Sequence, residues 1–128
     1  MGMGYGANYA DVVDEKFFVE HCPVEFQALK NLIAEHKMNW QDLYDMEMDD
    51  FEKDGDAVFK DTYENFQTAC EKATGICPHV GYHSSDDDGD RYDDIDGHYW
   101  HVEGVWGRTP AGKKYEADIE RKFFVTFG

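Results

Sequence analysis

The chain has 128 residues and a formal net charge of −16, from 28 acidic residues against 12 lysines and arginines. Its length predicts a single domain, residues 1–128, and an aromatic content of 16% argues against a disordered chain. The charge argues against direct binding to nucleic acid or to an anionic membrane surface, and no apolar run is long enough to span a bilayer. Three cysteines at no framework spacing and no visible secretory signal predict a cytoplasmic protein.

The first part of the chain, about residues 10–74, predicts helices. Glycines are frequent in residues 1–8, which predict a loop or a short edge segment. The apolar spacing over Asp11–Glu20 fits a short helix better than a strand, although both remain open. Pro23 stands at the first position of a clearer helix, which is expected to run to about Lys37.

Asn39 predicts the start of the next helix, over Trp40–Glu52, because its side chain can cap that helix. At about 100° per residue, the aromatic side chains of this helix fall on one side. Four acidic side chains fall on the opposite side, at axial spacings of about 4.5 to 6 Å. These acids are Asp42, Asp45, Asp49 and Glu52. Asp56 is then expected to cap a helix over Ala57–Ala73.

From Ile76 the apolar period changes from helical to alternating, which predicts a β-meander over about residues 76–127. Its strands are expected at Ile76–Ser84, His98–Gly107 and Lys114–Phe127, with a tight turn over Arg108–Lys113. Only the helices are available to cover the apolar face of this sheet. The sequence therefore predicts an α+β fold in which N-terminal helices pack on a three-stranded antiparallel C-terminal meander.

Two acidic stretches hold most of the net charge. Gln41–Glu64 carries ten carboxylates against two lysines, and Ser84–Gly97 carries seven aspartates against one arginine. Like charges at this density repel and reduce stability, and a net charge of about 2–8 already keeps a small domain soluble. The acids expected to bind a partner are Asp42, Asp45, Asp49, Glu52, Asp56, Asp86, Asp87, Asp88, Asp90, Asp93, Asp94 and Asp96.

Rows of carboxylates on a rigid scaffold can imitate the charge pattern of a nucleic-acid backbone. Duplex DNA presents one negative charge about every 1.7 Å of its axis, and proteins bind it with lysines and arginines. The leading hypothesis is an acidic inhibitor that occupies the basic DNA-binding cleft of a host protein, where a homodimer would lengthen the acidic face. A surface that serves only solubility is the alternative interpretation of the same charge.

The aspartate-rich stretch Asp86–Asp96 also suggests a calcium site. Its first aspartates have the alternating spacing of EF-hand ligands. Arg91 stands where an EF-hand loop needs glycine, however, and Gly97 stands where it needs glutamate. An EF-hand is therefore excluded, and a calcium-binding module of another kind, centred on this loop, is the second hypothesis.

Histidines and carboxylates allow a third hypothesis, a metal-dependent hydrolase. Cys77, His79, His83 and His101 form a conceivable zinc set, but their spacings match no standard motif. No Gly-x-Ser-x-Gly, Walker or His-Glu-x-x-His motif is present, and the cysteines lack a nucleophile signature. A non-enzymatic protein with no catalytic residue, metal ligand or cofactor is therefore expected.

Two short segments, Gly4–Tyr9 and Trp106–Lys113, resemble segments of small uncharacterised bacteriophage proteins. In overall character the chain resembles the DNA mimics that phages encode, which inhibit restriction enzymes, CRISPR effectors, gyrase and other host DNA-binding proteins. That class shares surface charge rather than a motif. The resemblance therefore implies an inhibitor that acts in the host cytoplasm, and it assigns no residue.

Overall fold

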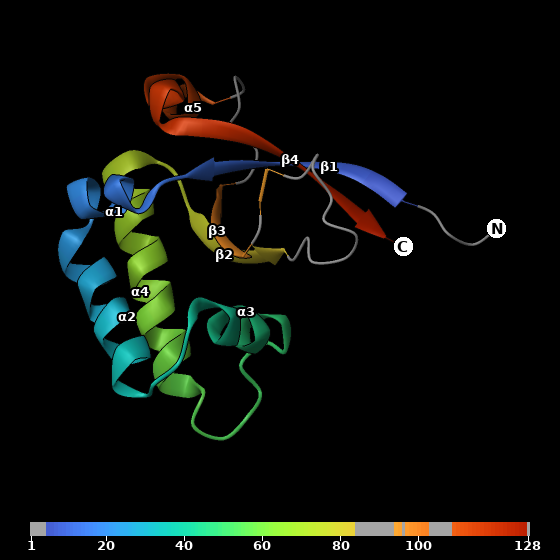
Figure 1. Ribbon diagram of the computed structural model, residues 1–128. Helices are drawn as coiled ribbons and strands as arrows, with labels where there is room; N and C mark the ends of the chain where they lie inside the picture. The colour runs from blue at the N-terminus through green and yellow to red at the C-terminus, as the bar shows by residue number, and fades with distance from the viewer. Residues whose placement is uncertain (1–4, 84–93, 96, 103–108, 128) are drawn as a thin grey trace.

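The computed structural model describes residues 5–83, 94–95, 97–102 and 109–127. These residues form five α-helices, one short 3₁₀ helix and a four-stranded antiparallel sheet (Figure 1). The strand order is β2-β3-β1-β4. The fold is α+β, but the prediction of a three-stranded C-terminal meander is wrong, because a strand from the N-terminal part of the chain lies inside the sheet.

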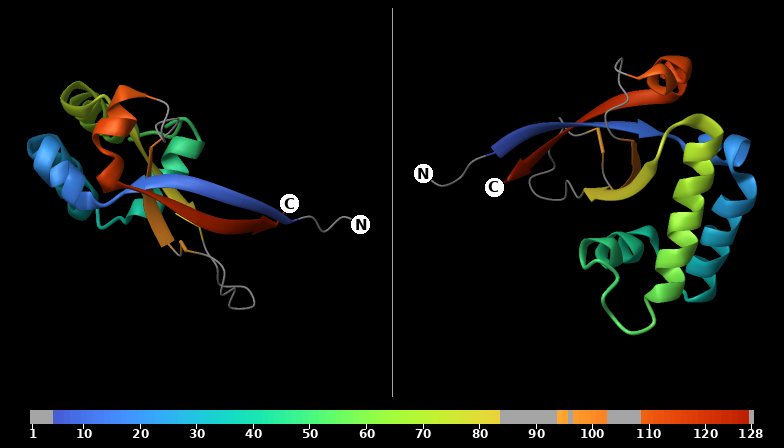
Figure 2. Two further views of the ribbon diagram at one scale, coloured as in Figure 1. Left: turned by 90° about the horizontal axis from the view of Figure 1, so that it is seen from above. Right: turned by 180° about the vertical axis from the view of Figure 1, so that it is seen from behind.

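That strand is β1, Tyr5–Val13, which lies between β3 and β4. It pairs with β4, Ile119–Phe127, along its whole length. It pairs with β3, Gly97–Val102, only at its last two residues. The strands β1 and β4 are therefore neighbours, and the start of β1 lies beside the end of β4 (Figure 2).

Val12 and Val13 explain why the sequence pattern of β1 misleads. Both are buried, although successive side chains of a strand point to opposite faces. Val13 belongs to the main core, whereas Val12 packs with Ala10 and Ile95 in a second, smaller cluster. A strand that is buried on both faces shows no apolar-polar alternation, so adjacent valines followed by adjacent phenylalanines fit a helix equally well.

The predicted helix over Asp11–Glu20 is therefore wrong in its first part. Helix α1 is Glu15–His21, and Asp14 caps it by accepting a hydrogen bond from the backbone N–H of Lys16 at 2.9 Å. Pro23 begins α2, Pro23–Glu35, as predicted. The chain thus leaves the sheet at Val13 and enters the helical layer within two residues.

Three further helices follow. Helix α3 is Trp40–Met48, and α4, Ala57–Thr74, packs beside α2 (Figure 1). The tight turn predicted over Arg108–Lys113 is wrong in its described part, because Pro110–Lys114 is helix α5, capped by the Thr109 hydroxyl. The 3₁₀ helix η1, Glu116–Asp118, then delays the start of β4. None of the helices in the described residues is both long and apolar enough to cross a bilayer.

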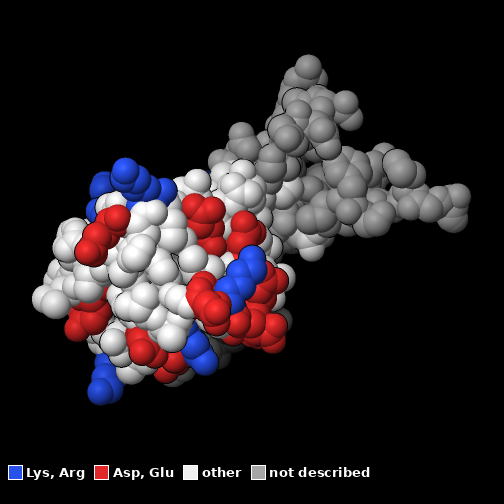
Figure 3. Space-filling model, turned by 90° about the horizontal axis from the view of Figure 1, so that it is seen from below, with Lys and Arg blue, Asp and Glu red and all other residues white. Residues whose placement is uncertain are grey.

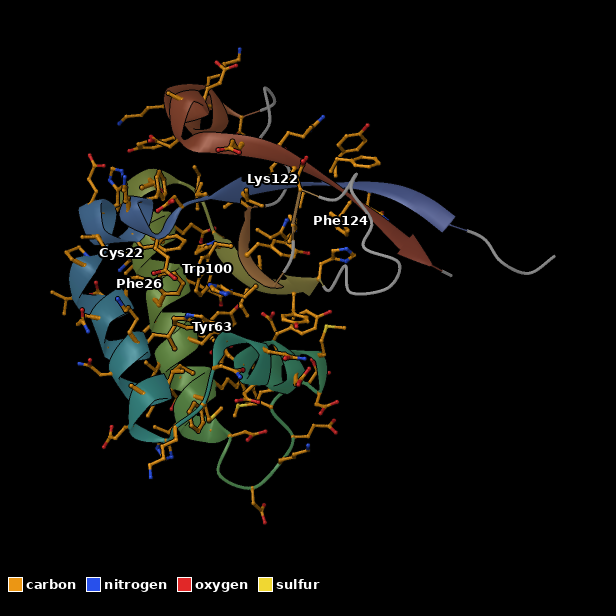
Figure 4. All side chains as sticks on the ribbon, in the orientation of Figure 1. Cys22, Phe26, Tyr63, Trp100, Lys122 and Phe124 are labelled. Atoms are coloured by element: carbon orange, nitrogen blue, oxygen red, sulfur yellow. The ribbon has the colours of Figure 1, made fainter. Side chains whose placement is uncertain are left out.

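Aromatic rings fill the main core between the helices and the sheet. The ring centroid of Phe18 lies 4.8 Å from that of Phe66 and 5.2 Å from those of Phe26 and Trp100. All four side chains are at most 2% exposed. Figure 4 shows Phe26 and Trp100 facing this interior from α2 and β3. The core therefore joins three helices to one face of the sheet.

Helix α4 covers the outer edge of β2, Pro78–His83, which is an edge strand. The hydroxyl of Tyr63 accepts a hydrogen bond from the backbone N–H of Val80 at 2.9 Å. One turn further along α4, the amide of Gln67 donates to the backbone oxygen of Pro78 at 2.9 Å. Side chains of a helix thus satisfy backbone groups that would otherwise be open to another strand.

The Tyr63→Phe substitution tests this edge contact, since it removes only the hydroxyl. The backbone N–H of Val80 is then buried without a partner, and we expect the free energy of unfolding to fall by about 1–3 kcal/mol. Urea denaturation measures the loss. The same substitution at Tyr9, which is 63% exposed, is the control and should change the free energy of unfolding by less than about 0.5 kcal/mol. Equal losses at both positions would contradict the contact.

Candidate acidic interface

Helix α3 and the loop to α4 bring four of the predicted acids to one groove. Asp42, Asp45, Asp49 and Asp56 line this groove together with Met38, Met46 and Lys53, and its volume is about 360 Å³. Figure 3 looks onto the end of the molecule that carries α3 and shows acidic side chains gathered there, with basic atoms among them. We call these seven residues the acidic groove.

The acidic row on α3 is shorter than predicted, because the helix ends at Met48. Asp50 and Phe51 have positive φ angles of 57° and 54°. Left-handed residues of this kind end a helix. Glu52 therefore lies beyond α3 and does not extend its row. The row that remains consists of Asp42, Asp45 and Asp49.

Two acids of the groove accept hydrogen bonds from backbone N–H groups. The Asp42 carboxylate accepts the backbone N–H of Asn39 at 2.9 Å, and the Asn39 side chain accepts that of Asp42 at 3.0 Å. Asp56 is only 7% exposed and accepts the backbone N–H of Lys53 at 3.2 Å. It makes no side-chain cap on α4, so that prediction is wrong. The exposed acids of the groove are Asp45 and Asp49.

The exposed acids do not stabilise α3. Asp49 lies at its C-terminal end, where the helix dipole disfavours negative charge, and its last turn has no basic residue. Lys53 lies 3.8 Å from the Asp49 carboxylate, with side chains 78% and 56% exposed. An ion pair this exposed contributes little to stability. Folding therefore does not account for Asp49, whereas Glu47 at the same end of the helix is only 27% exposed and faces His79.

Asp94 is the one predicted loop acid within the described residues. Its backbone N–H donates to the backbone oxygen of Phe123 at 2.8 Å, and its carboxylate accepts the N–H of Phe123 at 2.9 Å. Asp94 therefore pairs with the outer edge of β4. The other predicted loop acids lie outside the described residues: Asp86, Asp87, Asp88, Asp90, Asp93 and Asp96.

A second polar cluster lies at the edge of β2 and was missed by sequence reasoning. The Glu47 carboxylate of α3 lies 3.6 Å from Nδ1 of His79, and the Gln67 amide lies 3.2 Å from the same nitrogen. Burial and the Glu47 carboxylate raise the pKa of Tyr63 well above its ordinary value. No local sequence pattern predicts this cluster, because α3, α4 and β2 meet only in the folded chain.

The metal hypotheses gain no support from the part of the chain that the structure describes. Within it, no group of three or more His, Cys, Asp or Glu side chains is placed to hold a metal ion. The calcium hypothesis concerns the Asp86–Asp96 loop, most of which lies outside that part, and it stays a prediction.

Comparisons of this chain with protein-family models, with curated proteins and with solved structures find no match. Function is therefore inferred from the charge and geometry of the described residues. The acidic groove and the polar cluster at β2 are the two sites that carry such an inference.

Substitutions of Asp42 and Asp45 distinguish an acid that stabilises the fold from an exposed acid that does not. Asp42→Ala removes half of the reciprocal cap on α3, and we expect the free energy of unfolding to fall by about 0.5–2 kcal/mol. Asp45→Ala removes an exposed carboxylate and should change it by less than about 0.5 kcal/mol. Urea denaturation of both variants at the same salt concentration measures the difference. A larger loss at Asp45 would show that the cap is unimportant.

Proposed function

We propose that this chain is an acidic binding protein that mimics a nucleic-acid backbone and occupies a basic, DNA-binding surface of another protein. The observation that carries the proposal is the acidic groove, in which Asp42, Asp45, Asp49 and Asp56 line one hollow at the end of the molecule. Its exposed carboxylates, with those of the loop that follows α3, form the contact surface. The resemblance to phage-encoded mimics suggests a host restriction enzyme, CRISPR effector or gyrase as the partner.

The spacing of the row supports this proposal. A helix rises about 1.5 Å per residue, so Asp42, Asp45 and Asp49 are separated by about 4.5 and 6 Å along the axis. Phosphates of one DNA strand are separated by about 3.4 Å along the duplex axis. Lysines and arginines arranged for phosphates are flexible enough to follow carboxylates on this scale. The helix holds its row in place, which a mobile acidic tail does not.

The repulsion among the acidic side chains also supports the proposed function. The Gln41–Glu64 stretch alone holds ten carboxylates against two lysines, and mutual repulsion of such groups reduces stability. A basic partner removes that repulsion, speeds association at low salt and makes binding sensitive to ionic strength. Lys53 is well exposed beside Asp49, so a partner's arginine can replace it.

Capture from a bacterial lysate, with the tagged chain as bait, tests the function. We expect DNA-binding proteins at low salt, their loss when salt is raised from about 50 to 200 mM, and their release by added duplex DNA. Asp45→Asn with Asp49→Asn should reduce recovery at least about tenfold, because two exposed charges of the contact surface are removed.

The matched control is Asp61→Asn with Glu64→Gln, which removes the same charge from exposed positions on α4. This variant should retain the captured proteins. Equal losses from both double variants would assign the binding to net charge alone. Recovery of proteins that do not bind DNA, or retention that duplex DNA does not compete, would overturn the proposed function.

A further inference from the structure

A cysteine, a histidine and a glutamate lie in line at the edge of β2. The Sγ atom of Cys77 is 4.0 Å from Nε2 of His79. The other ring nitrogen, Nδ1, is 3.6 Å from Oε2 of Glu47 in α3. A thiol, an imidazole that can take its proton and a carboxylate that orients the imidazole are the parts of an activated cysteine nucleophile.

Helix α4 holds the imidazole and the carboxylate in place. Gln67 lies 3.2 Å from Nδ1 of His79 while its amide donates to the backbone of β2. The Tyr63 hydroxyl accepts the backbone N–H of Val80, and burial together with the nearby Glu47 carboxylate raises its pKa. Both side chains are themselves tied to the edge strand. The arrangement of Cys77, His79 and Glu47 is therefore held by contacts among α3, α4 and β2.

The tautomer of His79 decides whether it can take a proton from Cys77. A carboxylate beside Nδ1 favours the proton on that nitrogen, which leaves the lone pair of Nε2 toward the thiol. The Gln67 amide, 3.2 Å from Nδ1, favours the opposite tautomer, whereas the negative charge of the Glu47 carboxylate, 3.6 Å from the same nitrogen, favours a proton there. Glu47 also stabilises the imidazolium that forms after proton transfer. A separation of 4.0 Å is compatible with this role, since such contacts tighten when substrate binds.

Cys77 is also the accessible cysteine. Its side chain is half-buried, and those of His79 and Glu47 are 37% and 27% exposed. Cys22 and Cys70 are 2% and 0% exposed. The hydrogen bond with Cys70 and burial raise the pKa of the Cys22 thiol far above its ordinary value. The same hydrogen bond lowers the pKa of Cys70, but complete burial of Cys70 keeps reagents away from it. A small reagent therefore reaches Cys77 before the other two thiols.

We propose that Cys77 is a nucleophilic thiol that forms a covalent bond with small, soft electrophiles, with His79 as its base and Glu47 as the residue that positions His79. With an alkyl halide such as iodoacetamide, the thiol proton moves to Nε2 of His79. The bond from Sγ to carbon forms while the bond from carbon to iodine breaks, and iodide leaves. The site is separate from the acidic groove and does not depend on its partner.

Titratable groups from neighbouring elements lie near the thiol and the imidazole. Glu47 comes from α3, Tyr63 from α4 and His101 from β3, and the ring centroids of His101 and His79 are 6.3 Å apart. The raised pKa of Tyr63 keeps it neutral over the range of the test. A protonated His79 or His101 favours the thiolate. The Glu47 carboxylate opposes the thiolate directly but favours the protonated form of His79, which it contacts at 3.6 Å, and the second effect is the larger because His79 lies between Glu47 and the thiol. The pH profile of the reaction therefore reports the balance among them.

Iodoacetamide alkylation of the folded, full-length chain from pH 5 to 9 tests the proposal, with each cysteine quantified by mass spectrometry. We expect Cys77 to react first, with a pH midpoint at least one unit below the value of about 8.5 for a free cysteine. His79→Gln should slow its alkylation at pH 7 about tenfold and return the midpoint to that value. Glu47→Gln should move the midpoint in the same direction by a smaller amount.

The matched control is His98→Gln, because His98 forms a similar pair with Glu15 at 3.7 Å on a different part of the sheet. This variant should react like the unaltered chain. A midpoint near 8.5 for Cys77 in the unaltered chain would overturn the proposal, whether or not the variants fold. So would a normal rate in folded His79→Gln, or alkylation of Cys77 only after unfolding in urea.

Discussion

The hydrogen bonds between α4 and the outer edge of β2 connect the helical layer to the sheet. Tyr63 and Gln67 stand one helical turn apart and satisfy the two backbone groups of β2 that face them. An open edge strand invites pairing with other chains, and here helical side chains occupy it. Gln67 also lies 3.2 Å from His79, and the Glu47 carboxylate of α3 lies 3.6 Å from the same ring, so α3 meets the sheet at this edge.

The acids of the chain serve at least two physical roles. Some hold the backbone: Asp14 and Asp42 at helix starts, Asp56 in the loop before α4 and Asp94 at the edge of β4. Others, near the C-terminal end of α3, oppose the helix dipole. Only the second group needs an explanation beyond stability, and these acids are the reason to infer a basic partner.

Local signals predicted part of this structure well. Pro23 and Asn39 mark the starts of α2 and α3, because caps act on the next few residues only. The predicted end of α3 was wrong, since no sequence signal predicts the positive φ angles of Asp50 and Phe51. Of the predicted contact acids, the groove contains Asp42, Asp45, Asp49 and Asp56. Burial of Asp56 depends on how the loop folds back, which charge alone does not predict.

The sequence by itself determined the net charge, its concentration near α3 and the helical character of residues 23–74. Only the tertiary structure decided that β1 is a central strand, because its valines are buried by segments that lie far away in the chain. It also decided that Glu47 meets His79, whose other ring nitrogen lies beside the thiol of Cys77. Contacts of this kind join residues across long loops, so they depend on how whole layers pack and leave no local pattern.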